Sequence, residues 1–263
     1  MLPVIPGMPL YHLEDPLQDK GTMSDVAQRL PRARWREFSL RPGTCPICGP
    51  TVFIKLANHE TAIACSRCRA NPITLSLVAT IKRRVQSLQS HHVYVSPSSL
   101  ALTRWLNRNA AVVTVSEHLH EIEKGEFSAG IQCQDPQALT YPKQHFDVFA
   151  ALDVFEYVPD DTRAFAEAFR VLKPGAWLLF TVPPLRDTHT QERIRIVEGR
   201  VLMLRAPKYG QAARGKEKAL YCRNYGRDIG TRLAQAGFRE VQIENPKPRR
   251  WWGCARDVIV ARK

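Results

Sequence analysis

Two stretches of the sequence decide the fold. Residues 146–161 read FDVFAALDVFEYVPDD, and residues 170–183 read RVLKPGAWLLFTVP. The first opens on an almost continuous apolar run and the second closes on one, which is typical of strands covered on both faces. Between them, AFAEAFRVL has apolar residues at helical spacing, and Pro174 and Gly175 end that helix because neither continues one. The order strand, helix, strand indicates a parallel α/β sheet.

The same alternation extends over residues 91–263. Short apolar runs predict seven strands, at residues 92–96, 111–116, 130–134, 146–154, 175–183, 239–244 and 256–262. Apolar intervals of three or four residues predict helices at residues 72–88, 98–108, 160–172 and 225–237. Buried parallel strands need helices over both faces of their sheet. We therefore expect a Rossmann-like α/β domain with a seven-stranded sheet and helices on both faces.

The segment from Phe146 to Pro183 resembles the fourth strand, the next helix and the fifth strand of class I S-adenosylmethionine-dependent methyltransferases of type 11. The family pattern is roughly FDxVxxxxVxEHVPD, a helix and RVLKPGG, and Tyr157 stands here where the pattern has histidine. The strand and helix order fits this family from residue 91 to residue 263. The resemblance implies the cofactor S-adenosyl-L-methionine and a transferase activity.

The resemblance also implies that the cofactor lies at the carboxyl ends of the first strands. Glu117 is placed like the acid that accepts both ribose hydroxyls, and a carboxylate offers two oxygens to two donors. Asp135 is placed like the residue that meets the adenine amino group. The first loop, residues 95–100, has serines and no glycine, so the backbone approaches the cofactor less closely there. The implied cofactor-binding residues are Ser96, Ser98, Glu117, Asp135, Pro136, Asp153 and Val154.

Four cysteines precede the α/β part of the chain. Cys45 and Cys48 form one C-x2-C pair, Cys65 and Cys68 form another, and sixteen residues separate the pairs. Two such turns direct four thiolates to one centre, which is the tetrahedral coordination of a structural Zn2+. The residues between the pairs predict two short strands, as in a zinc ribbon. A redox-active CxxC pair is the alternative, and two matched pairs at this spacing argue against it.

Composition favours an intracellular protein with one large core. The chain has 263 residues, 44% of them hydrophobic, and seven cysteines. Two CxxC pairs in such a chain favour metal binding over disulfides. The N-terminal residues lack the basic and apolar pattern of a secretory signal, and no run approaches the ~20 apolar residues of a membrane span. We expect a cytoplasmic protein without a membrane partner, in which Cys133, Cys222 and Cys254 are ordinary thiols.

Charge and pattern together predict the organisation of the chain. Residues 185–263 hold 19 Lys and Arg against 8 Asp and Glu, whereas residues 91–184 hold 7 against 11. A basic flank either attracts an anionic partner, such as RNA or a phosphorylated acceptor, or solubilises the surface. The predicted parts are an N-terminal arm at 1–40, the zinc ribbon at 41–71 and the methyltransferase domain at 72–263, with a basic insertion at about 184–223.

Three functions remain open at this point. The first is methyl transfer to an oxygen or nitrogen nucleophile of unidentified substrate, in which the protein mainly positions the reactants. The second is a catalytically inactive methyltransferase-fold protein that binds or scaffolds, suggested by the loop without glycine. The third is an RNA methyltransferase, suggested by the basic flanks and by Trp251-Trp252. No pattern identifies catalytic residues; acceptor-side candidates, each also explained as a surface or packing residue, are Tyr157, His189, Glu192 and Tyr209.

Overall fold

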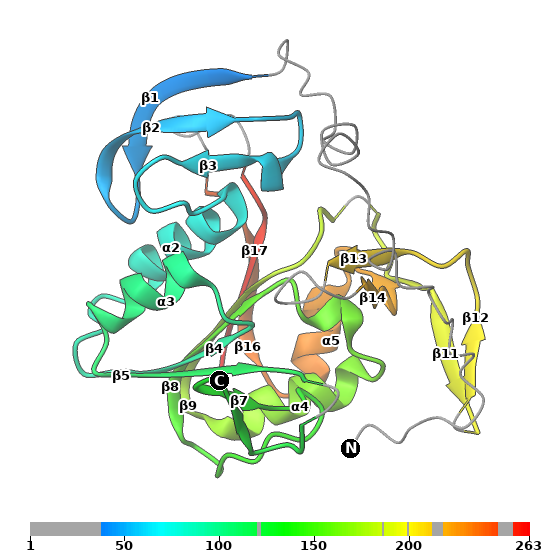
Figure 1. Ribbon diagram of the computed structural model, residues 1–263. Helices are drawn as coiled ribbons and strands as arrows, with labels where there is room; N and C mark the ends of the chain where they lie inside the picture. Colours follow the sequence, from blue (N-terminus) through cyan, green and yellow to red (C-terminus); the bar gives the residue numbers. More distant parts are fainter. Residues whose placement is uncertain (1–37, 120–121, 186, 199, 212–217, 247–254) are drawn as a thin grey trace, which may run out of the picture.

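The computed structural model describes residues 38–119, 122–185, 187–198, 200–211, 218–246 and 255–263. Figure 1 shows a large twisted sheet with helices on both faces and a separate small sheet beside two of these helices. Most of the predicted N-terminal arm, the Trp251-Trp252 pair and Cys254 lie outside the described residues.

The large sheet has the order β16-β17-β9-β8-β4-β5-β7-β6 within the described residues. Strands β4, β5, β7, β8 and β9 are parallel, and β17 runs antiparallel to both of its neighbours. The bounds are β4 His92–Ser96, β5 Val112–Glu117, β6 Phe127–Ser128, β7 Ile131–Cys133, β8 Phe146–Leu152, β9 Leu172–Thr181, β16 Arg239–Glu244 and β17 Val258–Arg262. This mixed sheet is Rossmann-like, and each of the seven predicted strands has a counterpart in it.

Strand β6 is an addition that the sequence pattern did not predict. It has two residues and pairs antiparallel with β7 through a tight turn at Ala129 and Gly130. Both turn residues have positive φ angles, 48° and 77°, which suits a two-residue hairpin. A strand this short has no visible period of its own, so only its pairing with β7 reveals it.

In the described part of the chain, two helices cover each face of the large sheet. The bounds are α2 Pro72–Arg84, α3 Leu100–Asn107, α4 Asp161–Val171 and α5 Ile229–Gln235. Helices α2 and α3 pack on one face in a core that includes Leu77 and Leu102. Helices α4 and α5 pack on the other face with Phe165 and Leu233. No helix of the described residues is long and apolar enough to cross a membrane.

The helix ends follow local capping chemistry. The Asn71 side chain accepts a hydrogen bond of 3.0 Å from the Thr74 N–H, and Pro72 stands at the first position of α2, where no N–H is needed. Helix α2 ends at Arg84, four residues before the predicted end, because Val85 is extended. At α4, the Asp160 side chain accepts a hydrogen bond from Arg163 N–H.

The cysteine segment forms a separate three-stranded antiparallel sheet. Its elements are β1 Ser39–Cys45, β2 Gly49–Lys55, the 3-10 turn η1 Glu60–Ala62 and β3 Ile63–Cys65. Strand β1 begins two residues before the predicted start of this module at residue 41. Phe53 and Ile63 are buried on its inner side, where Leu75 of α2 packs against them. The small sheet therefore shares a core with the first helix of the α/β domain.

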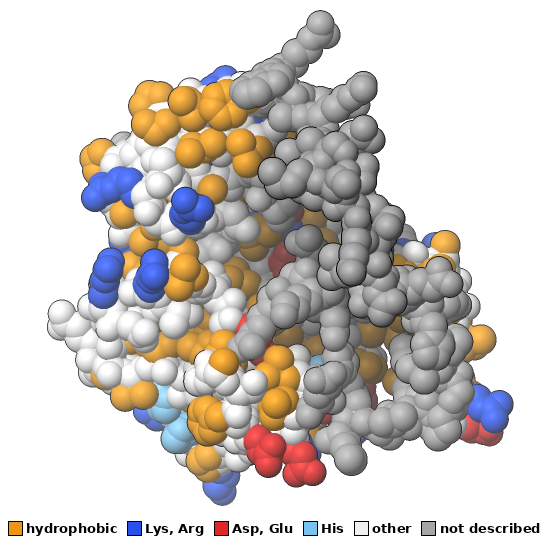
Figure 2. Space-filling view, in the orientation of Figure 1, with side chains coloured by type: hydrophobic (Ala, Val, Ile, Leu, Met, Phe, Trp, Pro, Cys, Tyr) orange, Lys and Arg blue, Asp and Glu red, His pale blue; other side chains and the backbone are white. Residues whose placement is uncertain are grey.

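The outer face of this small sheet is apolar. Leu40 pairs with Ile54 across the strands and Pro42 pairs with Val52, so these four side chains share one face. Leu40 is 55% exposed. Figure 2 shows apolar side chains gathered over β1 and β2, with Lys and Arg side chains over α2 and α3. The basic character of the protein therefore extends to the helices next to the cysteine module.

The basic insertion forms hairpins instead of an irregular loop. Strand β10 pairs with β15, β11 with β12 and β13 with β14, all antiparallel. The bounds are β10 Gln191–Glu192, β11 Ile194–Val197, β12 Arg200–Met203, β13 Tyr209–Gln211, β14 Lys218–Leu220 and β15 Arg223–Asn224. Strands of two to four residues are too short to show an apolar period, which is why the sequence did not reveal them.

Candidate functional site

The topology itself marks the place of a site. From β4 the chain proceeds to β5 and β7 on one side, and it returns to β8 and β9 on the other side. Ligands of open α/β sheets bind at such a switch point, outside the carboxyl ends of the strands. Ser96 ends β4, Glu117 ends β5 and Asp153 follows β8, so these three predicted residues meet at one edge.

Ser98 and Glu117 are brought together by the loop after β4. The Ser98 hydroxyl donates a hydrogen bond to Oε1 of Glu117, and only 1% of Glu117 is exposed. Ser96 is also buried, at the last position of β4. The Ser98 hydroxyl, in the loop after β4, thus contacts the carboxylate at the end of β5.

Asp135 and Pro136 lie in the loop after β7. Oδ1 of Asp135 accepts hydrogen bonds from the backbone N–H of Gln137 at 2.9 Å and from its side-chain Nε2 at 3.2 Å. The Gln137 side chain in turn accepts a hydrogen bond from Asp160 N–H at 3.0 Å. The Asp135 carboxylate therefore organises this loop and connects it to the start of α4. Pro136 is half-buried beside it.

Asp153 stands in a constrained turn directly after β8. Its φ of 49° is in the left-handed region, which is uncommon for a residue other than glycine. Oδ1 accepts a hydrogen bond of 2.7 Å from the Thr181 hydroxyl, and Oδ2 lies 3.4 Å from Nη2 of Arg256. The carboxylate is thereby held from two sides at the edge of the sheet. Val154, the next residue, is half-buried and packs against the core under α4.

Glu156 is a buried acid that the sequence analysis did not select. It lies in the 3-10 turn η2 Phe155–Tyr157, with 0% of its surface exposed. Neither carboxyl oxygen has a hydrogen-bond partner within the described part of the chain. Burial raises the pKa of Glu156 well above its usual range, and the charge of Asp153 raises it further. In sequence, Glu156 differs little from a helix-flanking acid, and only its burial distinguishes it.

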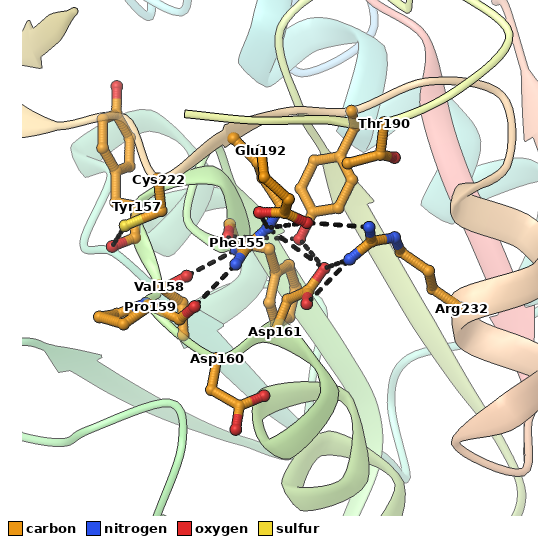
Figure 3. A network of polar contacts seen from close by, with 12 residues as sticks. Phe155, Tyr157, Val158, Pro159, Asp160, Asp161, Thr190, Glu192, Cys222 and Arg232 are labelled. Atoms are coloured by element: carbon orange, nitrogen blue, oxygen red, sulfur yellow. Dashed lines mark hydrogen bonds and ion pairs between the residues drawn. The ribbon is translucent and has the colours of Figure 1, made fainter. Parts of the chain in front are cut away.

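A buried ion-pair network fixes the η2 turn, as Figure 3 shows. Arg223, from β15 of the insertion, is only 3% exposed. Its guanidinium donates to the carbonyls of Phe155 at 3.2 Å, Val158 at 2.6 Å and Pro159 at 2.7 Å. These three carbonyls flank Glu156 on both sides. The basic insertion therefore contacts the turn that carries Glu156 and does not lie apart from it.

Two acids complete this network. Asp161 of α4 accepts hydrogen bonds from Tyr225 Oη at 2.9 Å and from Arg232 Nη1 at 2.9 Å. Glu192 bonds Arg223 Nε at 3.1 Å and Arg232 Nη2 at 2.9 Å. Both carboxylates are thus already paired with arginines. Glu192, an acceptor-side candidate in the sequence, lies in this structural network.

The other acceptor-side candidates occupy different surroundings. Tyr157 packs on Tyr221 with ring centroids 4.6 Å apart, and a Cβ at Gly210 would collide with the Tyr157 hydroxyl. Burial raises the pKa of Tyr157 above its usual range, as do the Tyr221 hydroxyl and the charge of Glu156. Tyr209 is 49% exposed, and His189 is exposed as well. Of these candidates, Tyr157 alone adjoins the buried acid.

The four cysteines of the small sheet converge on one point. Their sulfur atoms all lie within 4.8 Å of one another, with Cys45 and Cys68 3.6 Å apart and Cys48 and Cys65 3.5 Å apart. Four bonds of about 2.3 Å in a tetrahedron place sulfurs about 3.8 Å apart, so the set is close to the right size for zinc. Burial by itself would raise the pKa of Cys65, but the Cys68 N–H and the Thr51 hydroxyl lower it to about 7.

Comparisons with known proteins relate this chain to methyltransferases. Residues 93–180 match the family model described as a methyltransferase domain. A curated relative, the ubiquinone biosynthesis O-methyltransferase of Coxiella burnetii strain Dugway 5J108-111, is 29% identical over 119 residues, which are 42% of this chain and 50% of the relative. The same enzyme from strain RSA 493 has the same identity and coverage. The chain thus spans about half the length of the curated relatives it matches.

Solved structures with a similar chain path include two bacterial proteins. The S-adenosylmethionine-dependent methyltransferase of Mesorhizobium loti has a TM-score of 0.48 and 15% identity, over 72% of this chain and 98% of that one. A protein of Thermotoga maritima described as a SAM-dependent methyltransferase, possible histamine N-methyltransferase, has a TM-score of 0.45 and 15% identity, over 72% of this chain and 89% of that one. The family match runs from β4 to β9, so it includes the strands β4, β5 and β8, after or at whose ends Ser96, Glu117 and Asp153 lie.

Proposed function

We propose that this protein is an S-adenosylmethionine-dependent methyltransferase that methylates an oxygen of its acceptor. One observation carries the proposal, namely that buried Glu117 ends β5 while Asp153 and buried Glu156 directly follow β8, at the carboxyl ends of parallel strands. The methyltransferase domain match covers the same strands. The choice of oxygen over nitrogen is supported by the curated relatives, which are named O-methyltransferases. The substrate itself is left open.

The residues at the edge suit the parts of this cofactor. Glu117, buried at the end of β5, offers carboxylate oxygens to the two ribose hydroxyls. Asp135 and Pro136 would border the adenine ring, and Asp153 and Val154 the methionine portion, with Ser96 and Ser98 in the first loop. When bound, the cofactor supplies a methyl group on a sulfonium, which is already activated for displacement.

Glu156 is the group best suited to receive the proton of an acceptor hydroxyl. Methylation of a hydroxyl requires that its proton be lost, and a raised pKa makes a carboxylate a stronger base. Both of its oxygens lack partners in the described structure, so a donor on the acceptor would satisfy them. The Tyr157 and Tyr221 rings would form an aromatic wall next to it.

Cofactor binding tests the proposal directly. Titration calorimetry of the full chain with S-adenosylhomocysteine should show saturable binding. Glu117→Gln should weaken it by about 1.5–3 kcal/mol, the usual contribution of a charged hydrogen bond. The matched control is Glu123→Gln, which changes an exposed acid of the next loop and should leave the affinity unchanged. An absence of binding at millimolar cofactor would refute the proposed function.

A catalytically inactive binding protein is the second candidate. It is favoured by the Ser98 hydroxyl, which already occupies Oε1 of Glu117 where a ribose hydroxyl would bind. The two candidates differ in turnover: a labelled methyl group should appear in an acceptor with the enzyme and remain on the cofactor with a scaffold.

An RNA acceptor is supported by the basic surface over α2 and α3. Binding to RNA should then weaken steeply with salt.

The cysteine cluster supports a structural zinc ion. Cys45, Cys48, Cys65 and Cys68 supply four sulfurs, so no coordination position is left for a substrate. Zinc would hold the β1–β2 turn against the end of β3 in a sheet that has few other buried residues. Metal analysis of the purified protein should find one zinc ion per chain, and its absence after metal-replete expression would contradict this assignment.

A further inference from the structure

Arg256 connects the cysteine module to the edge of the large sheet at which Glu117 and Asp153 lie. It precedes β17, and because β17 is antiparallel, its start lies at the carboxyl ends of β8 and β9. The guanidinium donates Nε to Oε2 of Glu60 at 3.1 Å, and Nη2 also contacts the other Glu60 oxygen. The same Nη2 lies 3.4 Å from Oδ2 of Asp153. One arginine thus bridges an acid of the cysteine module and an acid of the candidate cofactor site.

The surroundings of Arg256 leave it little freedom. Its side chain is 4% exposed, compared with 26% for Glu60 and 24% for Asp153. Nη1 donates to the Val182 carbonyl at 2.5 Å, and the Arg256 backbone N–H donates to the Ser76 hydroxyl of α2 at 3.0 Å. A buried guanidinium with one partner removed is an uncompensated charge, so it would shift toward its remaining acids. The position of Glu60 therefore affects how Arg256 meets Asp153.

Glu60 is in turn placed by the segment that carries the cysteines. It starts the 3-10 turn η1, which leads directly into β3, and β3 ends at Cys65. The Leu56 N–H and the Ala62 carbonyl close the loop around it at 2.9 Å. A metal ion that binds Cys65 would hold the end of β3 and, through it, this turn. Glu60 and Arg256 thus connect the segment that ends at Cys65 with the Asp153 carboxylate.

We propose that Glu60 and Arg256 are positioning residues for the Asp153 carboxylate, so that metal binding in the cysteine module tightens a cofactor site that it does not touch. This inference rests on the proposed function for its ligand. By this inference, the cysteine module contributes to binding of the methyl donor. Glu60 and Arg256 do so by orienting Asp153, without contacting the acceptor.

The test combines one substitution with metal removal in the full chain. Binding of S-adenosylhomocysteine is measured by calorimetry for the wild type and for Glu60→Gln, each with zinc and after chelation. Glu60→Gln should raise the Kd about tenfold, a usual size for coupling between sites. Chelation should raise the wild-type Kd similarly but change that of Glu60→Gln by no more than about twofold, since the connection is already lost. The control is Glu240→Gln, which breaks the exposed pair with Arg262 at the opposite end of β17 and should bind like the wild type.

A second measurement separates this inference from the proposed function. Hydrogen exchange of peptides that cover residues 152–158 and 180–183 reports the edge without any ligand. Faster exchange there in Glu60→Gln, but not in Glu240→Gln, would support the connection even if the cofactor failed to bind and the proposed function fell. Unchanged exchange, or a Kd of Glu60→Gln equal to that of the zinc-loaded wild type, would overturn it.

Discussion

Replacing Arg223 by methionine should loosen the turn that carries Glu156. Methionine keeps much of the length of the side chain but removes every hydrogen-bond donor. The carbonyls of Val158 and Pro159 would lose their arginine donor, and Glu192 would lose one of its two arginines. The Phe155 carbonyl would keep only its longer hydrogen bonds, each of 3.3 Å, from the Tyr225 hydroxyl and the Val158 N–H. The three carbonyls lie on both sides of Glu156, so most of the loss falls on one short segment.

The expected magnitude follows from the burial of this arginine. Arg223 is 3% exposed, and removal of one partner from a buried ion pair costs about 3–5 kcal/mol. Asp161 limits the loss because Arg232 and Tyr225 still bond it. For a protein of this size, such a change lowers the Tm by roughly 6–20 °C. Arg223→Lys, which keeps the charge but donates from a single point, should fall between the wild type and the methionine variant.

Urea unfolding and thermal unfolding measure the loss. The matched control is Arg83→Met, since the Arg83 side chain is 50% exposed and Arg84 also contacts its partner Glu244. An exposed pair contributes about 0–1 kcal/mol, so this variant should unfold almost like the wild type. If Arg223→Met also lost less than about 1 kcal/mol, the network would not hold the turn, and the reasoning from burial would be refuted.

Two further variants test the buried acid and the metal site. Because burial and the charge of Asp153 raise the pKa of Glu156, the folded protein retains a proton that the unfolded chain releases above about pH 4.3. The free energy of unfolding should therefore fall as the pH rises from there toward the raised pKa, and in Glu156→Gln this fall should be missing; parallel profiles from urea unfolding would contradict it. Cys45→Ser should abolish stoichiometric zinc binding and speed hydrogen exchange in β1–β3, whereas Cys133→Ser, outside the cluster, should keep the metal; retained zinc in Cys45→Ser would exclude the four-sulfur site.

Much of the fold could be predicted from the sequence because its elements are strongly patterned. The apolar runs of β4, β8 and β9 are buried on both faces, so burial and sequence period coincide. The helices deviate from their predicted ends by a few residues, as at Val85, where the backbone changes to an extended conformation. The hairpins at residues 191–224 escaped prediction because short strands derive their order from pairing and not from an apolar period.

For the candidate site, sequence and tertiary structure contributed different things. Spacing alone determined the cysteine quartet, because two CxxC turns bring their ligands together locally. The family resemblance selected Glu117 and Asp153, and both follow or end parallel strands whose ends share one edge. Glu156, Arg223 and Arg256 could be recognised only in the folded chain. Their significance lies in burial and in contacts with residues up to 196 positions away, as between Arg256 and Glu60, and such long-range pairing leaves no local pattern in a sequence.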